Sequence, residues 1–382
     1  MNFYLWGWSG QFNTGDDVFL HVVASQLRRE NQNCRLFMEG DRSGYTSRLC
    51  GVQTVKTRGW SPPLTTRLRR AWFRRQSGCF VLAGGTLLPT LKGVNDLLND
   101  RHWFERGRRM VAVGLSVGPF ESSAHEAAVG TLLSQMEHVA LRDDFSYDWA
   151  MARKLPTRIV RAFDLAVLFP QSLPAMVVPP PAKRTLGISL LAWRGQSDRK
   201  RMPDDLDLAR QFGARLAPLA ARANLDVVFL SLCLNPDSDD RLMAQAFGEG
   251  FGRERLQLFD HDGDPVRTYR KIQSLSHLVS MRLHGGILAY TAGVPFLQLE
   301  YHPKCQDFAR TIGLADGHRF AINPFDLEKL IQGVERLLEM KGVDSQMSIL
   351  AAQERASLNF TDLSAKAPKT AVLAHLGHQP QV

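Results

Sequence analysis

The most informative stretch of the sequence is Leu278–Lys304, which reads LVSMRLHGGILAYTAGVPFLQLEYHPK. A short apolar run ends at Arg282 and His284, a helix-like segment follows the two glycines, and a turn at Gly293–Pro295 leads into a second apolar run. This order of strand, helix and strand is the repeating unit of a parallel sheet covered by helices. Ligands of such sheets bind where the strands end, because the free N–H groups of the next helix point there and suit an anion.

Arg282 and His284 occupy the place in this unit where a ligand would bind. The guanidinium group of an arginine is a planar donor for a carboxylate or a phosphate. A histidine gives or takes a proton near neutral pH. Taken alone, His284 would more often be a buried structural or capping histidine, but its position at a helix start beside Arg282 favours a catalytic role. The unit therefore predicts a site that binds a small anion and moves a proton.

The same alternation of strands and helices runs through the rest of the chain. Apolar runs that end in glycine or polar residues recur in both halves, and a segment with five prolines, 170–181, lies between them. Proline stiffens the chain and cannot continue a ladder of hydrogen bonds, which indicates a linker. A chain of 382 residues agrees with two domains of roughly 150–200 residues each. We predict an N-terminal α/β domain over 1–170, a linker over 171–183, a C-terminal α/β domain over 184–365 and a flexible tail over 366–382.

Small and polar residues end successive strands expected in the first half. Asn13 and Asp16 lie in the segment 10–17, GQFNTGDD, between a strand and a helix. One such residue would suffice as a helix cap, so several of them favour contact with a ligand. Gly84 and Gly85 end a later apolar run, where close packing of a turn and approach of the backbone to a ligand are the two interpretations. Neither a dinucleotide-binding glycine pattern nor a P-loop follows.

Two further strand ends add charged residues. Arg142 and Asp143 follow an expected strand at 139–141, and solvated surface charge is the alternative interpretation of both. Arg194 follows the first expected strand of the second half, in a position equivalent to that of Arg282. Two arginines at one site could each hold one anionic group. Together, the polar strand ends predict a cleft better than any single motif does.

Composition limits the class of protein. The chain is 44% apolar and 22% charged, as is usual for a globular protein. No apolar run is long enough for a transmembrane helix, and the N-terminus does not resemble a secretory signal. The five cysteines are scattered, odd in number and without zinc-binding spacing, so we expect reduced thiols, a cytoplasmic protein and no metal.

The net charge of +9 is concentrated in one segment. Residues 56–75 contain seven basic and no acidic side chains, with Trp60, Trp72 and Phe73 among them. A solvated basic helix is one interpretation. A peripheral contact with anionic lipid at the inner face of the plasma membrane is another. Nucleic acid is the third, but no nucleic-acid-binding motif supports it, so we expect no nucleic-acid partner.

Five motifs, in chain order, resemble those of the polysaccharide pyruvyl transferases: GQFNTGDD, LAGGTLL, VGLSVGP, LRDDFS and the block that runs from SMRLHGG to YHPK. The resemblance covers the chain from about residue 7 to residue 304, and its most specific part is Arg-Leu-His at 282–284. It implies two Rossmann-like domains in a glycosyltransferase-B-like arrangement, with the active site in the cleft between them. It also implies transfer of pyruvate from phosphoenolpyruvate to two hydroxyls of a sugar, which forms a cyclic ketal on a cell-surface polysaccharide or its lipid-linked precursor and releases phosphate.

The resemblance also implies roles for residues of the expected cleft. His284 would be the general acid that protonates the methylene carbon of phosphoenolpyruvate. The groups in contact with phosphoenolpyruvate would be Arg194, Arg282, Leu283 and Gly285. Asn13 and Asp16 would lie on the acceptor side of the cleft. The other residues expected to line the cleft are Gly84, Gly85, Arg142 and Asp143. No step requires a cofactor. Two alternatives remain open, namely a glycosyltransferase of the same fold that uses a nucleotide sugar and a non-catalytic binding protein of glycan assembly.

Overall fold

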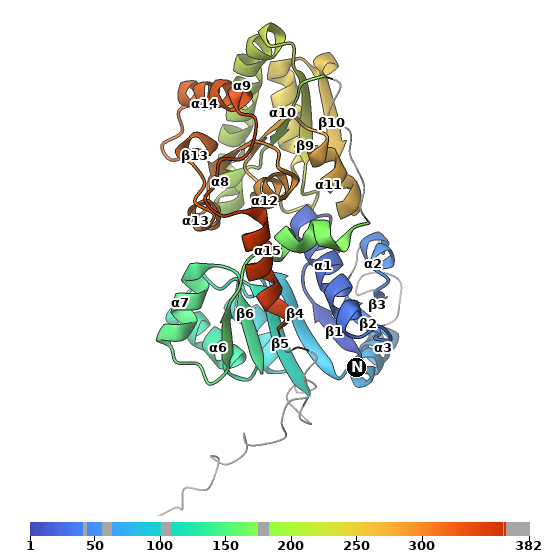
Figure 1. Ribbon diagram of the computed structural model, residues 1–382. Coiled ribbons are helices and arrows are strands. Elements are labelled where there is room, and N and C mark those ends of the chain that lie inside the picture. The colour runs from blue at the N-terminus through green and yellow to red at the C-terminus, as the bar shows by residue number, and fades with distance from the viewer. Residues whose placement is uncertain (41–43, 56–62, 101–107, 175–182, 362, 364–382) are drawn as a thin grey trace, which may run out of the picture.

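The computed structural model describes residues 1–40, 44–55, 63–100, 108–174, 183–361 and 363. They form two α/β domains stacked one on the other, each built on a parallel sheet (Figure 1). Parallel strands need crossover connections, and every crossover in both sheets contains a helix. The predicted class of two Rossmann-like domains is therefore confirmed.

The N-terminal sheet has seven parallel strands in the order β3-β2-β1-β4-β5-β6-β7. Alternate residues of the inner strand β1 enter different cores, Phe3 and Leu5 on one face and Tyr4 on the other, because side chains of a strand alternate between its faces. Both faces are thus covered, as the unbroken apolar runs of its central strands indicate. The elements are β1 (Phe3–Trp6), α1 (Thr14–Glu30), β2 (Leu36–Glu39), α2 (Tyr45–Leu49), β3 (Gln53–Val55), α3 (Pro63–Gln76), β4 (Cys79–Gly85), α4 (Leu91–Leu98), β5 (Arg109–Leu115), α6 (Ser123–Ser134), β6 (His138–Leu141), α7 (Asp144–Ala152) and β7 (Arg158–Arg161).

The C-terminal sheet has six parallel strands in the order β10-β9-β8-β11-β12-β13. A 3₁₀ helix, η1 (Leu165–Ser172), leads out of the first domain towards it. The elements are β8 (Thr185–Ser189), α8 (Trp193–Ser197), η2 (Arg199–Arg201), α9 (Met202–Arg222), β9 (Asp226–Ser231), α10 (Arg241–Phe251), η3 (Arg253–Arg255), β10 (Leu256–Asp260), α11 (Pro265–Gln273), β11 (His277–Ser280), α12 (Leu283–Ala292), β12 (Phe296–Glu300), α13 (Pro303–Thr311), η4 (Asp316–His318), β13 (Arg319–Ala321), α14 (Leu327–Glu339), α15 (Ile349–Ser357) and η5 (Leu358–Phe360).

The strand orders place one topological switch point in each domain. In the N-terminal sheet β1 and β4 are neighbours, and the chain leaves them towards opposite edges. In the C-terminal sheet β8 and β11 are the corresponding pair. Connections that leave such a pair in opposite directions open a crevice at the carboxyl ends of the strands. The residues that follow β1, β4 and β11 meet at the domain boundary for this reason.

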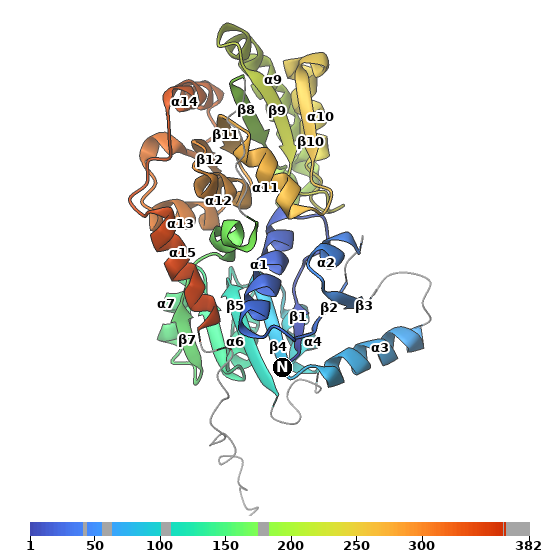
Figure 2. The same ribbon diagram turned by 45° about the vertical axis from the view of Figure 1, so that its right-hand side comes forward.

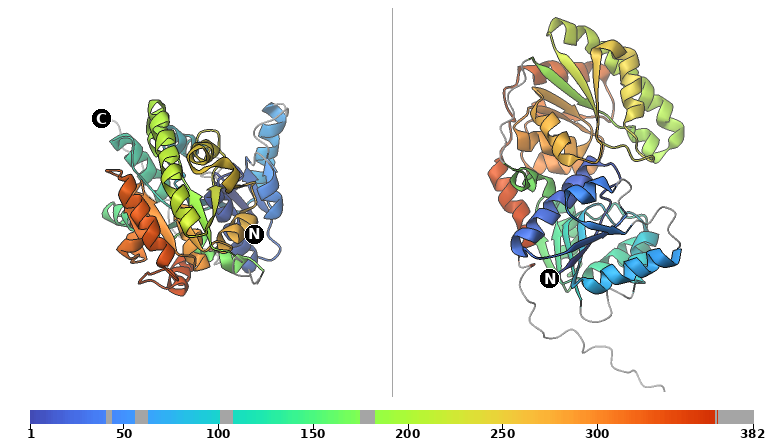
Figure 3. Two further views of the ribbon diagram at one scale, coloured as in Figure 1. Left: turned by 90° about the horizontal axis from the view of Figure 1, so that it is seen from above. Right: turned by 90° about the vertical axis from the view of Figure 1, so that its right-hand side faces the viewer.

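Backbone pairing and a shared core join the two domains. Asn13, just before α1, forms an antiparallel bridge with Cys233 after β9, and Thr14 N donates a hydrogen bond to Leu232 O at 2.9 Å. One cluster of buried apolar side chains continues from the N-terminal sheet and α1 into β9, α11 and α12. Figure 3 shows α1 reaching the C-terminal domain. The loop before α1 is therefore fixed to the second domain.

The end of the described chain returns to the first domain. α15 runs from the C-terminal domain along the N-terminal one (Figure 1, red). Beyond it, Asn359 Oδ1 accepts a hydrogen bond from Gly114 N at 2.6 Å, and its Nδ2 donates to Phe163 O at 2.9 Å. We predicted a C-terminal domain over 184–365, whereas the residues after α15 pack against the first domain.

Parts of the predicted linker and tail lie outside the described residues, namely 175–182 and 366–382. None of the described helices combines the length and the apolar character that a membrane crossing needs.

A buried network holds the start of α1 in place. Asp17 Oδ1 accepts a hydrogen bond from Gly10 N at 2.6 Å, and Asp17 Oδ2 lies 2.7 Å from His261 Nε2 of the other domain. His261 Nδ1 lies 2.8 Å from Thr268 Oγ1. Because the side chains of Asp17 and His261 are fully buried, loss of one leaves its partners without a hydrogen bond and without water.

Replacing Asp17 with alanine is expected to lower the free energy of unfolding by about 3 kcal/mol, because buried partners are left unpaired. Asp262→Ala is the matched control, since the half-exposed Asp262 carboxylate pairs with Arg267 at the surface. The free energy of unfolding of Asp262→Ala should differ from that of the wild type by no more than about 0.5 kcal/mol. Urea unfolding followed by circular dichroism measures both variants, and equal losses would contradict the role of the network.

Candidate functional site

A cavity of about 290 Å³ lies where the two switch points meet. Its walls come from the loop before α1, the start of α1, the residues that end β4 and follow β6, and the turn from β11 into α12. Of the residues predicted from the sequence, the cavity brings together Asn13, Asp16, Gly85, Arg142, Arg282, Leu283 and His284.

Two predicted glycines lie beside the cavity and not in its lining. Gly84 has a φ of +75°, and a Cβ there would lie 2.8 Å from Phe19 Cδ2. A Cβ at Gly285 would lie 2.2 Å from Ser280 Oγ. Both positions require glycine because neighbouring side chains pack directly on the backbone.

Asp143 and Arg194 are also outside the cavity lining. Asp143 is the N-cap of α7, where its carboxylate accepts a hydrogen bond from Ser146 N at 2.8 Å. The Arg194 guanidinium lies 4.8 Å from the ring centre of Trp193 on α8. β8 ends at Ser189, and α8 begins before the arginine, which separates Arg194 from the end of the strand.

Arg282 is the N-cap residue of α12 and is held by an acidic side chain. Its Nη2 donates to Asp240 Oδ1 at 2.5 Å and to Ser238 O at 2.9 Å, and its Nε lies 3.2 Å from both Asp240 oxygens. Burial disfavours its charge, but the Asp240 carboxylate raises the pKa of Arg282 above its ordinary range. Within the described residues, Nη1 has no hydrogen bond. Arg282 is thus a fixed cation with one nitrogen left for a ligand.

His284, in the first turn of α12, packs against the start of α1 in the other domain. A Cβ at Gly15 would lie 2.0 Å from His284 Nδ1, so glycine at position 15 leaves the space that the ring occupies. The ring of Phe19 meets it edge-on with centroids 5.0 Å apart. His284 Nε2 is buried without a hydrogen-bond partner in the part of the chain described, and it lies 3.9 Å from Asp164 Oδ2.

Burial lowers the pKa of His284 to about 4. The Asp164 carboxylate opposes this shift, while the positive charges of Arg142, Lys304 and Arg282 add to it. The ring is therefore neutral at pH 7 while nothing is bound. An anion that offsets the three cations would raise its pKa.

Arg142 is a buried part of the cavity wall. Its Nη1 donates to Asp164 Oδ2 at 2.8 Å, and both side chains are less than 10% exposed. The interpretation of Arg142 as solvated surface charge is therefore wrong. The Asp164 carboxylate thus orients the Arg142 guanidinium and also faces the ring of His284.

Sequence reasoning gave no role to Tyr301, Lys304, Asp164 or Asp240. Tyr301 and Lys304 line the cavity, and Lys304 adds a third cation to it. The spacing Tyr-x-x-Lys at the end of the quoted block was the available signal for both. Asp164 and Asp240 lie far along the chain from the arginines that they hold, and no local pattern marks them.

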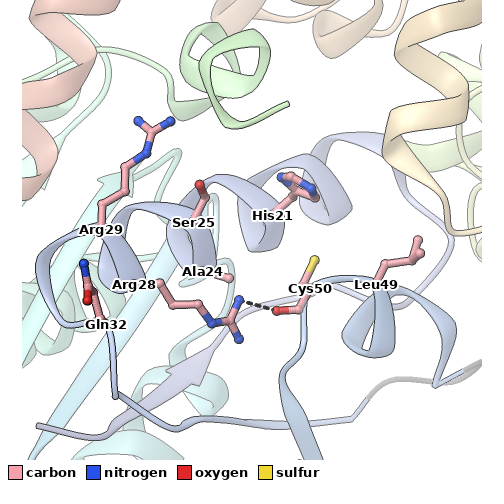
Figure 4. Close-up of a pocket in the computed structure, with 8 residues that line it drawn as sticks. All are labelled: His21, Ala24, Ser25, Arg28, Arg29, Gln32, Leu49 and Cys50. Atoms are coloured by element: carbon pink, nitrogen blue, oxygen red, sulfur yellow. Dashed lines mark hydrogen bonds between the residues drawn. The ribbon is translucent and has the colours of Figure 1, made fainter. Parts of the chain in front are cut away.

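A larger open groove, about 520 Å³, lies along α1 (Figure 4). Its basic groups already bind backbone carbonyls: Arg28 donates to Cys50 O at 2.6 Å and to Gly51 O at 2.8 Å, and Arg29 donates to Gln171 O. The interdomain cavity is the better candidate site because its cations face the open space. Among the described residues, no group of three or more His, Cys, Asp or Glu side chains could hold a metal ion.

Fold and cavity define a two-domain α/β protein of the glycosyltransferase-B type, with a cationic site between the domains. The sequence matches the family model of the polysaccharide pyruvyl transferases over residues 13–303. The chain therefore belongs to the polysaccharide pyruvyl transferases, which are enzymes. No curated protein sequence matches it.

Solved structures with a similar fold include UDP-N-acetylglucosamine 2-epimerases. A putative epimerase from Listeria monocytogenes has a TM-score of 0.60 and 13% identity, and the match covers 94% of this chain and 92% of that chain. The enzyme from Neisseria meningitidis bound to UDP-GlcNAc has a TM-score of 0.57 and 11% identity, and the match covers 94% of this chain and 97% of that chain. The enzyme from Methanocaldococcus jannaschii has a TM-score of 0.60 and 9% identity, with 93% and 97% covered. At these identities the likeness shows the fold alone.

The ring of His284 is expected to titrate near pH 4 in the free protein, far below an exposed histidine. Nuclear magnetic resonance of the histidine rings measures this, with His284→Gln identifying the signal. Asp164→Asn should lower the midpoint further, because it removes the carboxylate that favours the charged ring. A midpoint near pH 6.5 would show that the ring is exposed in solution.

Proposed function

We propose that this enzyme transfers pyruvate from phosphoenolpyruvate to two hydroxyls of a sugar in a cell-surface polysaccharide or its lipid-linked precursor. The product is a cyclic ketal, and phosphate is released. The observation that carries the proposal is the convergence of Arg142, Arg282 and Lys304 with His284 in one cavity of a chain from this family. Phosphoenolpyruvate carries a carboxylate and a phosphate on three carbons, which suits several cations close together.

The size of the cavity supports a compact donor. Its volume of about 290 Å³ lies just below the range of roughly 300–1,000 Å³ that is usual for ligand sites. A nucleotide sugar is several times larger than phosphoenolpyruvate. The small cavity therefore disfavours the alternative of a glycosyltransferase that uses a nucleotide sugar, although the fold suits one. Membership of an enzyme family disfavours the alternative of a non-catalytic binding protein.

His284 is the proposed general acid. The bound donor would offset the charges of Arg142, Lys304 and Arg282, which are among the causes of the low pKa of the ring. The protonated ring then gives its proton to the methylene carbon, and the positive charge that develops on the neighbouring carbon accepts a sugar hydroxyl. Departure of phosphate and attack by the second hydroxyl complete the ketal.

The acceptor is proposed to enter from the N-terminal side of the cavity. Asn13 and Asp16 lie there, on the loop before α1 and in its first turn. Arg194 is left out of this proposal because the structure does not bring it to the cavity.

His284→Gln is expected to lower phosphate release from phosphoenolpyruvate by about 10²–10⁴-fold, because the acid is lost while the cations remain. The assay uses methyl glycosides of galactose, glucose, mannose and N-acetylmannosamine as acceptors. His21→Gln, outside the cavity, is the matched control and should keep wild-type rates. Titration calorimetry should show binding of phosphoenolpyruvate and not of UDP-GlcNAc to the wild type; the reverse result would support the glycosyltransferase.

We further propose that α3 brings the enzyme to an anionic membrane at the inner face of the plasma membrane, where a lipid-linked acceptor would lie. α3 projects from the body of the protein (Figure 2). Leu68, Arg69, Trp72 and Arg75 recur at steps of three and four residues and so share one face. All four are exposed, Leu68 by 61% and Trp72 by 49%. Apolar side chains flanked by arginines suit lipid headgroups.

The opposite face of α3 binds the protein. Phe73 is buried there, and Arg74 pairs with Asp100 at 2.7 Å while Arg70 pairs with Glu39. Thus only part of the basic segment 56–75 faces outward; its residues 56–62 lie outside the described residues. The five cysteines are free, which agrees with the proposed cytoplasmic location.

Arg69→Gln with Arg75→Gln should weaken binding to vesicles that contain phosphatidylglycerol by about 30-fold, because each basic residue near an anionic surface contributes about 1 kcal/mol. Leu68→Ser with Trp72→Ser should also weaken it. Vesicle sedimentation is the measurement, and Arg222→Gln with Leu350→Ser, exposed on other helices, is the control. Equal losses in the control would exclude a specific contact through α3.

A further inference from the structure

We infer that Asp16 is the second proton-transfer group of the reaction: it gives a proton to the departing phosphate and then accepts the proton of a sugar hydroxyl. This inference rests on the proposed function. Asp16 lies in the first turn of α1 and lines the cavity on the side of the N-terminal domain. Within the described part of the chain, only the backbone oxygen of Asp16 takes part in a side-chain hydrogen bond, and its carboxylate is available to a substrate in the cavity.

Close backbone packing brings Asp16 and His284 to the same space from different domains. The ring of His284 lies against Gly15, the residue directly before Asp16. On the other side, Asp16 Oδ1 lies 3.6 Å from the place that a Cβ of Gly85 would take. The carboxylate therefore stands between the end of β4 and the start of α12, within the cavity that holds the ring.

The charged groups around Asp16 act in opposite directions. Burial raises the pKa of Asp16 to about 7, and the neighbouring charge of Asp17 adds to this. Arg142, Lys304 and Arg282 oppose it. Near pH 6 the free enzyme thus carries its exchangeable proton on the carboxyl group of Asp16, while burial keeps the ring of His284 neutral. Environments that push two pKa values apart in this way mark acid and base pairs.

A bound donor raises both pKa values, because its negative charges offset the three cations and repel a carboxylate. Asp16 and His284 are then both protonated when the acceptor arrives. The reaction needs two protons delivered, one to the methylene carbon, which becomes a methyl group, and one to the phosphate, which leaves as hydrogen phosphate. The two attacking hydroxyls release two protons. One restores His284 and the other restores Asp16, so atoms and charges balance without another reactant.

Asp16→Asn tests the inference, because the amide keeps the shape and cannot release a proton. Phosphate release in the methyl glycoside assay should fall by about 10²–10⁴-fold. Binding of phosphoenolpyruvate should not weaken. At pH 8 the wild type must first take up a proton on Asp16, so the variant should bind the donor up to about tenfold more tightly, and at pH 6 the two should bind equally.

The uptake of protons when phosphoenolpyruvate binds separates a proton-transfer role of Asp16 from a structural one, because a structural role would not change this uptake. Calorimetry of phosphoenolpyruvate binding at pH 8, in buffers with different ionisation heats, should show up to one more proton taken up by the wild type than by Asp16→Asn. Asp262→Asn, at the surface, is the control and should match the wild type. Equal proton uptake in wild type and Asp16→Asn, or wild-type phosphate release by Asp16→Asn, would overturn the inference. A wild type that binds no phosphoenolpyruvate would overturn the proposed function itself.

Thermal unfolding shows whether Asp16→Asn is folded, and its pH dependence tests the charge of the Asp16 carboxyl group in the wild type. The folded pKa of about 7 lies above the ordinary pKa of an aspartate, 3.8, so the wild type loses stability as pH rises between these two values. The variant should lack this loss and melt at a higher temperature than the wild type at pH 8, with no difference below pH 4. An unchanged melting temperature at pH 8 would show that the carboxylate is solvated, against the inference.

Discussion

The pairing of the loop before α1 with the loop after β9 is the constraint on which the site depends. The bridge between Asn13 and Cys233 fixes the backbone, and the buried contact between Asp17 and His261 fixes the first turn of the helix. With this turn in place, Gly15 leaves the space that the ring of His284 fills. The opposite domain thus covers most of the ring, and this burial keeps the ring neutral at pH 7. The low pKa of His284, the proposed proton donor, thus follows from the docking of the two domains.

The sequence predicted the central strands and missed several edge strands, for a physical reason. β1, β4 and β11 are buried on both faces and appear as short unbroken apolar runs. β7 and β10 lie at the edges of their sheets, and most of their residues are partly or fully exposed. Their composition, RIVR and LQLFD, has no clear apolar run, so nothing local distinguishes them from loops. Their place is decided by the neighbouring strand.

For the site, local reasoning succeeded where a strand end decides the position of a side chain. Arg282 and His284 directly follow β11 and lie in the cavity, as predicted. It failed for Arg194, because α8 begins before this residue, and nothing in the spacing reveals that helix. The carboxylates of Asp164 and Asp240 were also missed, since they meet their arginines only through tertiary packing.

The return of α15 to the first domain has a mechanical consequence. The polypeptide crosses the domain boundary twice, once after η1 and again before α15 (Figure 1). Two tethers allow bending about the line that joins them but resist twisting and separation. A cut in the backbone ahead of α15 would therefore remove one of the two tethers and leave every residue that lines the cavity unchanged.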